Sequence, residues 1–274
     1  MRNGHKCIAL ITACVLLAGC GGNAKKNQPG GKTATQQPAA VLNAGYAALD
    51  SKDYNEAIAK ADEFLLGTPH GPGSAEALYL KGRSLEEKTA GDQAEAKANL
   101  QSARAAYIQA LEQMPRQPLE AYIRASLANV AYFQDDYPTA ISQWTAAYDK
   151  LDKDDLKAWA LYRVGLSQQR LGQFAQADQT FANVQQLHPN TIPAQRAREH
   201  QGARAFFVQL ATFASPASAT RAAAELQRQG VAASTAADSA GHSVLRIGPI
   251  SSYTQAAYYK TRFAEQYPDA VVLP

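Results

Sequence analysis

The side chains best suited to ligand chemistry lie within residues 205–274. They are one aromatic ring, one amide, one imidazole and one guanidinium: Phe207, Gln209, His242 and Arg246. A glutamine amide both donates and accepts hydrogen bonds. A guanidinium offers donors in fixed geometry to carboxylate or carbonyl oxygens, and planar rings offer flat contact surfaces. These residue types are suited to noncovalent binding by hydrogen bonds and flat apolar contacts.

Sequence patterns of catalysis are missing. The chain has no Gly-x-Ser-x-Gly elbow, no His-Glu-x-x-His pair and no phosphate-binding glycine loop. Several histidines are scattered without metal-ligand spacing: His70, His188, His200 and His242. Asp152, Asp154 and Asp155 lack the glycine and terminal glutamate of a calcium loop. We expect Asp154 and Asp155 to cap the next helix and oppose its dipole. The chain is therefore predicted to be no enzyme and to hold no cofactor or metal.

The hydrophobic pattern of residues 205–274 predicts strands and helices in the order βαββαβ. The strands fall at 205–213, 231–237, 242–247 and 271–273, and the helices at 216–229 and about 252–267. Gly230 is placed to end the first helix, and Gly248-Pro249 to stop the third strand. This order favours one antiparallel sheet with both helices on one face, so that the other face is uncovered and available for binding.

Strand alternation divides the side chains between these two faces. Beneath the helices we expect an apolar set: Phe206, Val208, Leu210, Leu245 and Ile247. The uncovered face then carries the candidate set, together with Val244, which shares a side with His242 and Arg246. The alternative is that these are ordinary solvated residues of the sheet.

This stretch resembles the SPOR domain, the sporulation-related repeat of bacterial envelope proteins. The matching positions lie in both helices and in the first and third strands: Phe207, Val208, Gln209, Leu210, Phe213, Leu226, Gly230, Arg246, Ile247, Gly248, Pro249, Ala256, Ala257 and Phe263. The resemblance implies a ferredoxin-like fold that binds septal peptidoglycan, specifically glycan strands stripped of their stem peptides. It places Gln209, Thr212, His242 and Val271 on the glycan face. Gln209 would then bond sugar hydroxyls and N-acetyl groups. Phe207 and His242 would stack on pyranose rings, and Arg246 would meet lactyl carboxylates or carbonyls.

The chain departs from the family in two places on this face. Val244 stands where many SPOR domains carry an arginine, and Arg246 is the candidate substitute because strand side chains repeat with period two. His242 replaces a frequent aromatic residue. The βαββαβ order also fits an RNA-recognition module, but residues 244–247 lack its aromatic signature. The net charge of +3 without a dense Lys/Arg cluster gives no support for nucleic-acid binding.

Residues 39–204 are alanine-rich, helical in pattern and repetitive. Residues 156–189 have the spacing of a tetratricopeptide repeat, carried by Leu161, Gly165, Phe174, Ala177, Phe181 and Pro189. Other copies match at Gly45, Tyr54, Ala57, Phe64 and Pro69; at Gly82, Ala103, Tyr107, Ala110 and Pro115, with an insertion around residues 89–99; and at Ala128, Tyr137, Ala140, Trp144 and Ala147. Small residues allow close helix approach, so four helix pairs are expected to stack as a solenoid that residues 193–204 cap.

The first twenty residues have the pattern of a targeting segment. Arg2 and Lys6 precede an apolar run at residues 7–17 that is too short to span a bilayer. Residues 17–20, Leu-Ala-Gly-Cys, resemble the lipobox of bacterial lipoproteins, which implies cleavage before Cys20 and its lipidation. The alternative is an ordinary cleavable signal. By the same resemblance, Gly21 favours the outer membrane. Cleavage would remove Cys7 and Cys14 and lipidation would use Cys20, so no cysteine would remain for a disulfide.

The predicted fold class is mixed, α plus α/β: an all-α TPR-like helical-repeat solenoid followed by a small βαββαβ ferredoxin-like SPOR domain. The expected divisions are a signal peptide at 1–20, a flexible linker at 21–38, repeats at 39–204 and the SPOR domain at 205–274. The expected function is a lipid-anchored envelope protein that binds glycan strands of peptidoglycan and recruits protein partners through its repeats. The alternative is a scaffold of outer-membrane biogenesis or cell division in which the SPOR domain is only a weak locator. Wall-metabolising catalysis is a third possibility, with only the location in its favour.

Overall fold

The computed structural model describes residues 36–238 and 240–274. The predicted signal peptide, Cys20 and most of the predicted linker lie outside these residues. The chain divides into two compact units, Met1–Gln113 and Met114–Pro274. Among the described residues, no helix is both long enough and apolar enough to cross a bilayer.

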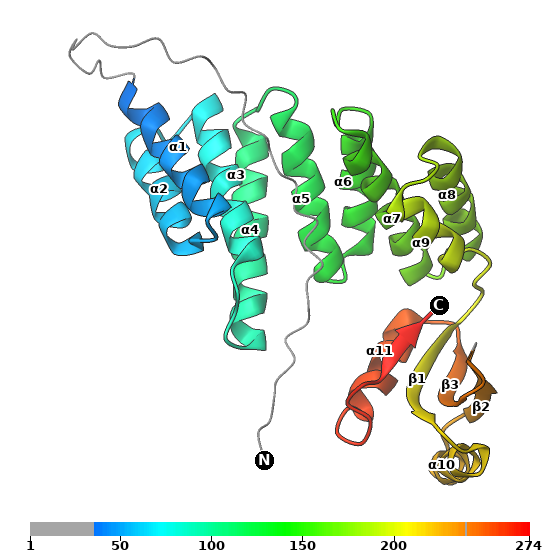
Figure 1. Ribbon diagram of the computed structural model, residues 1–274. Coiled ribbons are helices and arrows are strands. Elements are labelled where there is room, and N and C mark those ends of the chain that lie inside the picture. The colour runs from blue at the N-terminus through cyan, green and yellow to red at the C-terminus, as the bar shows by residue number, and fades with distance from the viewer. Residues whose placement is uncertain (1–35, 239) are drawn as a thin grey trace. The chain divides into compact units, whose positions relative to one another are not determined.

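The described part of the first unit consists of helices in two successive pairs (Figure 1). They are α1 (Gln36–Asp50), α2 (Tyr54–Gly67), α3 (Pro72–Glu87) and α4 (Gln93–Glu112). Asp53 and Asp92 cap α2 and α4, because their carboxylates accept hydrogen bonds from the backbone N–H of Glu56 (3.1 Å) and Glu95 (2.8 Å). The insertion expected around residues 89–99 lies largely inside α4, which has 20 residues.

The second unit continues the helical repeats before the sheet begins. Its helices are α5 (Leu119–Phe133), α6 (Tyr137–Tyr148), α7 (Asp154–Arg170), α8 (Phe174–Leu187) and α9 (Ile192–His200). The expected capping of α7 by Asp154 and Asp155 is wrong. Lys153 occupies the N-cap position without a side-chain cap, and both aspartates lie in the first helical turn, where they oppose the dipole.

Glycines allow the paired helices to approach closely, as the repeat pattern predicts. A Cβ atom added to Gly82 would lie 2.4 Å from Tyr107 Cε1, and one added to Gly165 would lie 2.5 Å from Phe181 Cε1. Both rings are fully buried. In these two pairs, α3–α4 and α7–α8, the first helix therefore accepts an aromatic ring of the second helix directly against its backbone.

Replacing Gly165 with alanine is expected to lower the free energy of unfolding of the repeats by about 1–3 kcal/mol, because the added methyl group overpacks the Phe181 ring. Gly67→Ala is the matched control, since Gly67 lies in α2 and nothing approaches its added Cβ within 4 Å. Urea unfolding followed by far-UV circular dichroism measures both. Equal stability of the two variants would contradict the packing described.

The C-terminal part of the second unit is a four-stranded antiparallel sheet with two helices. Its elements are β1 (Phe206–Phe213), α10 (Pro216–Arg228), β2 (Ala233–Ala237), β3 (Ser243–Ile250), α11 (Tyr253–Arg262) and β4 (Val271–Leu273). The strand order is β2-β3-β1-β4, with neighbouring strands antiparallel. The βαββαβ order predicted from the sequence is confirmed.

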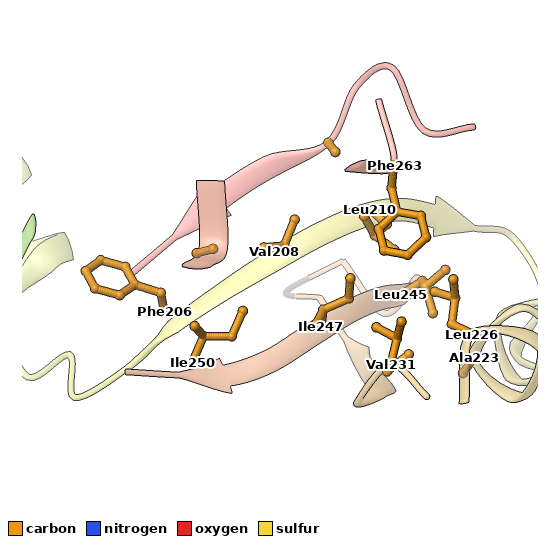
Figure 2. Close-up of a cluster of buried hydrophobic side chains, with 13 residues drawn as sticks. Phe206, Val208, Leu210, Ala223, Leu226, Val231, Leu245, Ile247, Ile250 and Phe263 are labelled. Atoms are coloured by element: carbon orange, nitrogen blue, oxygen red, sulfur yellow. The ribbon is translucent and has the colours of Figure 1, made fainter. Parts of the chain in front are cut away.

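Both helices cover one face of this sheet. The five side chains predicted for the core are all buried, and they pack with Ala223 and Leu226 of α10, with Ala256 of α11 and with Phe263. Figure 2 shows Val208 and Leu210 of β1 and Ile247 of β3 on the same side of the sheet as Phe263. The opposite face is left without a covering helix of its own domain.

Three details of the sheet differ from the sequence prediction. Gly248-Pro249 does not stop the third strand: Phe206 pairs with Ile250 and Val208 with Ile247, so the two residues form a bulge inside β3. The last helix ends at Arg262, earlier than expected, and its C-cap residue Phe263 (φ −104°) belongs to the core. β2 begins at Ala233, two residues later than expected.

Candidate ligand-binding face of the C-terminal sheet

A polar row crosses the uncovered face at the centre of the sheet. Gln209 of β1 is the backbone partner of Arg246 on β3 and of Val271 on β4, and Arg246 is in turn the partner of Ser234 on β2. Residues paired in register lie side by side on one face. The sequence therefore placed Gln209 and Arg246 correctly on a common face, and the structure makes them direct neighbours.

The Arg246 guanidinium lies over an aromatic ring of the same face. Its Cζ atom is 4.6 Å from the centre of the Phe207 ring, which fixes the guanidinium by a cation–π contact. Its buried Nε has no hydrogen-bond partner, and the side chain forms no ion pair with the described residues. The Arg246 guanidinium is positively charged, is positioned by the Phe207 ring and has an N–H donor without a partner. Such a group is suited to bind an anionic or carbonyl oxygen of a ligand.

A second bulge brings Thr212 to the uncovered face. Leu210 is buried and Ala211 pairs with Leu245, after which Thr212 pairs with Val244. The bulge therefore puts Thr212 on the uncovered face, whereas strict alternation from Leu210 would have put it on the core side. Val244 is only 5% exposed and contributes a packed apolar patch.

His242 lies beside the sheet, in the turn between β2 and β3. The carboxylate of Asp238 accepts hydrogen bonds from the backbone N–H groups of Ala240 (2.9 Å) and His242 (2.8 Å), and it lies 3.0 Å from His242 Nδ1. These bonds, foremost the one from the His242 backbone, lower the pKa of Asp238. The imidazole side chain is 56% exposed, so its ring is available at one end of the face.

A hollow of about 480 Å³ adjoins the row at the edge of β1. β4 pairs with β1 only as far as Gln209, and the hollow is lined by residues 209–212 of β1 and residues 266–269 of the loop before β4. Gln209, Thr212, Gln266 and Asp269 give it amide, hydroxyl and carboxylate groups. Sequence reasoning missed the loop residues. The Pro268-Asp269 break was the only signal that a loop lies there.

Apolar surface flanks the polar row on the β4 side. Val271 and Leu273 are 42% and 41% exposed, and Leu273 is the backbone partner of Phe207. The face thus alternates apolar patches with hydrogen-bonding groups. Sugars present the same combination, since their ring faces carry C–H groups and their edges carry hydroxyls. The site has the chemistry for noncovalent capture of a glycan.

Metal-ligand side chains are not clustered in the described part of the chain. No group of three or more His, Cys, Asp or Glu residues there is placed to hold a metal ion. Two titratable groups of the first unit are perturbed by burial within the repeats: burial raises the pKa of Tyr46, and it also raises the pKa of Glu76, the hydrogen-bond partner of Tyr46. Tyr107, whose pKa burial raises, donates to Glu86 at 2.7 Å.

Arginine and tryptophan side chains meet on helices α7 and α9. Arg196 Cζ lies 5.3 Å from the Trp159 ring, and Arg163 Cζ lies 6.0 Å from the same ring and 5.7 Å from that of Trp144. Arg163 also donates to the Asn129 side chain on α5. Arg196 is half-buried and forms no ion pair with the described residues. Arg163, Arg196, Trp144 and Trp159 form the Trp159 cluster of the second unit.

Comparison with known proteins assigns both regions. The SPOR domain family matches residues 202–274, a family described as outer membrane lipoprotein (YfiO) matches residues 25–146, and the tetratricopeptide repeat family matches residues 159–191. No curated protein matches the chain. The protein therefore consists of tetratricopeptide repeats followed by a C-terminal SPOR domain, as the sequence predicted.

Solved structures with similar chains include a tetratricopeptide repeat protein from Parabacteroides merdae, the MamA protein and pilF of Pseudomonas aeruginosa. Their sequence identities are 17%, 15% and 15%, with TM-scores of 0.48, 0.48 and 0.46. They cover 60%, 88% and 86% of this chain, and the matches span 59%, 100% and 94% of their own lengths. The chain thus spans about three-fifths of the first of them.

These assignments define the class of the protein. A SPOR domain implies peptidoglycan binding, and tetratricopeptide repeats together with the outer membrane lipoprotein match imply protein interaction in the cell envelope. Domains of these families are binding and scaffolding modules rather than catalytic ones.

Proposed function

We propose that the protein is a lipid-anchored envelope protein that docks on stem-peptide-free glycan strands through the uncovered face of its SPOR sheet. The observation that carries this proposal is the Gln209–Arg246 pair. An amide and an arginine without an ion pair stand side by side, with an aromatic ring beneath the guanidinium and a polar hollow next to the amide. Glycan without stem peptides exposes the lactyl carboxylates that such an arginine would bind.

Each proposed contact uses a group on this face. The amide of Gln209 and the hydroxyl of Thr212 would bond sugar hydroxyls and N-acetyl groups in the hollow. Phe207, Val271 and the His242 ring would pack against pyranose faces, and Arg246 would pair with a lactyl carboxylate. Since each contact is modest, recognition depends on several sugars of one strand binding together.

The repeats would supply the second attachment. We assign protein partners to the helical repeats and suggest the Trp159 cluster as one contact, because Arg196 offers a cation without an ion pair. The proposed lipid on Cys20 would give a third attachment, to a membrane and by resemblance to the outer one. Linkage makes each later engagement intramolecular, so that modest individual affinities suffice for retention in the envelope.

Lipidation is tested by a single substitution. Cys20→Ala is expected to abolish incorporation of a labelled fatty acid into the protein, because the thiol that would carry the acyl chains is lost; each buried CH₂ of such chains contributes about 0.8 kcal/mol to anchoring. Metabolic labelling of cells followed by immunoprecipitation measures the incorporation. Equal labelling of Cys20→Ala and the unmodified protein would refute the anchor at this residue.

Binding to the wall is tested by co-sedimentation with purified sacculi. We expect the protein to pellet with sacculi, and to pellet more after an amidase has removed the stem peptides. An unrelated monomeric protein of similar charge controls for trapping. Equal sedimentation of the two proteins, with or without amidase, would refute the proposed glycan binding.

A second function is favoured by one observation. Val244, at a position where many SPOR domains carry arginine, is 5% exposed and brings no charge to the face. If glycan binding is correspondingly weak, the repeats would carry the function as a scaffold of outer-membrane biogenesis or division. Deleting residues 205–274 from a fluorescent fusion separates the two: loss of septal foci supports docking on glycan, and an unchanged distribution supports the scaffold.

A further inference from the structure

An aromatic cluster joins the SPOR domain to the last helical repeats within the second unit. Phe206 at the start of β1 contacts Tyr253 at the start of α11, with ring centres 5.6 Å apart. From the repeats, Phe174 at the start of α8 lies 5.5 Å from Phe206, and Tyr137 at the start of α6 lies 6.1 Å from Tyr253. Phe174 packs against the hydrophobic core of the sheet.

Arg170 completes this cluster from the end of α7. Its Cζ atom is 3.5 Å from the centre of the Tyr253 ring, which is the shortest cation–π distance among the described residues. Its Nη1 is buried without a hydrogen-bond partner. A cation that gives up water to stack on a ring of the other domain indicates a dry, fitted contact rather than a chance approach of two surfaces.

The segment that connects α9 to β1 is bound by side chains of α8. Asp178 of α8 accepts a hydrogen bond from the backbone N–H of Gly202 at 2.8 Å and pairs with Arg204 at 2.7 Å. Gln185 of α8 donates to the Gln201 side chain at 3.0 Å. Both α8 residues bind the short segment that leads from α9 into β1, so this segment is attached along its length and does not act as a free linker.

The junction uses the helix-covered side of the sheet. Phe206 belongs to the core face of β1, whereas Phe207, Gln209 and Arg246 belong to the opposite face. Docking through Phe206 and Tyr253 therefore leaves the candidate glycan face unoccupied by the junction.

We propose that this junction locks the SPOR domain to helices α5–α9 as one rigid body, so that the glycan face is presented at a fixed angle to the repeats. The fixed angle follows from the contacts alone. Its use, to hold a partner of the repeats in a set orientation to the glycan, rests on the proposed function.

Residual dipolar couplings of the full chain test the lock without any glycan. We expect backbone couplings from residues 119–200 and 206–273 to fit one common alignment tensor. Arg170→Gln and Tyr253→Ala should each abolish the common fit while the chemical shifts of both domain cores persist. Tyr258→Ala is the matched control, because this tyrosine of α11 is 59% exposed and outside the junction.

Two different tensors in the unmodified chain, or a common tensor retained in both junction variants, would overturn the proposal.

Trypsin cleavage after Arg204 gives a second readout that does not depend on the stability of Tyr253→Ala. Asp178→Ala removes two attachments of the connecting segment and should accelerate release of a fragment beginning at Ala205 several-fold over the unmodified chain. Unchanged release would show that the segment is not held by Asp178. Because neither measurement involves glycan, failure of the lock and failure of wall binding are separable.

Discussion

Arg246→Ala is expected to weaken binding to stem-peptide-free glycan about ten- to hundredfold. A hydrogen bond to a charged group contributes about 1.5–3 kcal/mol, and about 1.4 kcal/mol corresponds to a factor of ten in affinity. The guanidinium forms no ion pair with the described residues and stacks on Phe207, so its loss removes a ligand contact rather than an internal ion pair. Quantitative sedimentation with amidase-treated sacculi measures the effect.

Two further variants are measured in the same sedimentation assay: one separates the charge of Arg246 from its planar geometry, and the other controls for the loss of an arginine elsewhere. Arg246→Lys retains the charge but not the planar fork, so intermediate binding is expected. Arg221→Ala removes an exposed arginine of α10 on the helix-covered side, and it should bind like the unmodified protein. Equal binding by the Arg246→Ala and Arg221→Ala chains would exclude Arg246 from the glycan contact.

Gly248→Ala is expected to destabilise the SPOR domain by about 2–6 kcal/mol. Gly248 has φ +134°, and an added Cβ would lie 2.9 Å from the Phe206 carbonyl oxygen and 2.8 Å from Phe207 Cδ1. The strained backbone costs about 1–3 kcal/mol and the overpacking a similar amount. The obstructing carbonyl belongs to β1, so it cannot move aside without disturbing the pairing of β1 with β3.

Hydrogen exchange of the β1 and β3 amides in the full chain reports the stability of this domain alone. Protection should fall by roughly 30-fold or more, because about 1.4 kcal/mol is a factor of ten. Gly230→Ala is the control: Gly230 has φ +74° but nothing lies within 4 Å of its added Cβ, so only the backbone cost of about 1–2 kcal/mol applies. If both variants lose equal protection, the close approach of the Phe206 carbonyl to Gly248 does not limit which residue position 248 tolerates.

The sequence was sufficient for features that depend on local periodicity. Alternation in β1 and β3 identified the core side chains Val208, Leu210 and Ile247, and the repeat spacing identified Gly165 as a position of close helix approach. In both cases the side-chain period of one helix or strand decides which face is buried. Residues close together in the sequence are therefore sufficient to predict that face.

Features that depend on register between distant strands could not be predicted this way. The bulge at Leu210 and Ala211 turns Thr212 to the uncovered face, and the bulge at Gly248-Pro249 lets β3 continue to Ile250. Both arise from how β1 and β3 pair across about thirty intervening residues, which no single-strand pattern contains.

The candidate site could be predicted in part from the sequence for the same reason. Gln209, Arg246 and Phe207 were predictable as residues of one face, but the contact of Arg246 with Phe207 and the hollow beside Thr212 require the assembled sheet. The junction residues Arg170 and Tyr253 gave no sequence signal, because a lone arginine and a lone tyrosine are ordinary on helix ends.

The central claim, that glycan binds the uncovered side of the sheet, is tested most directly by nuclear magnetic resonance. An isotope-labelled full chain would be titrated with a glycan oligosaccharide that lacks stem peptides. The account predicts chemical-shift changes that concentrate on Phe207, Gln209, Thr212, Arg246 and Val271 and that disappear in Gln209→Ala. Changes confined to α10 and α11, or no saturable change at all, would contradict it.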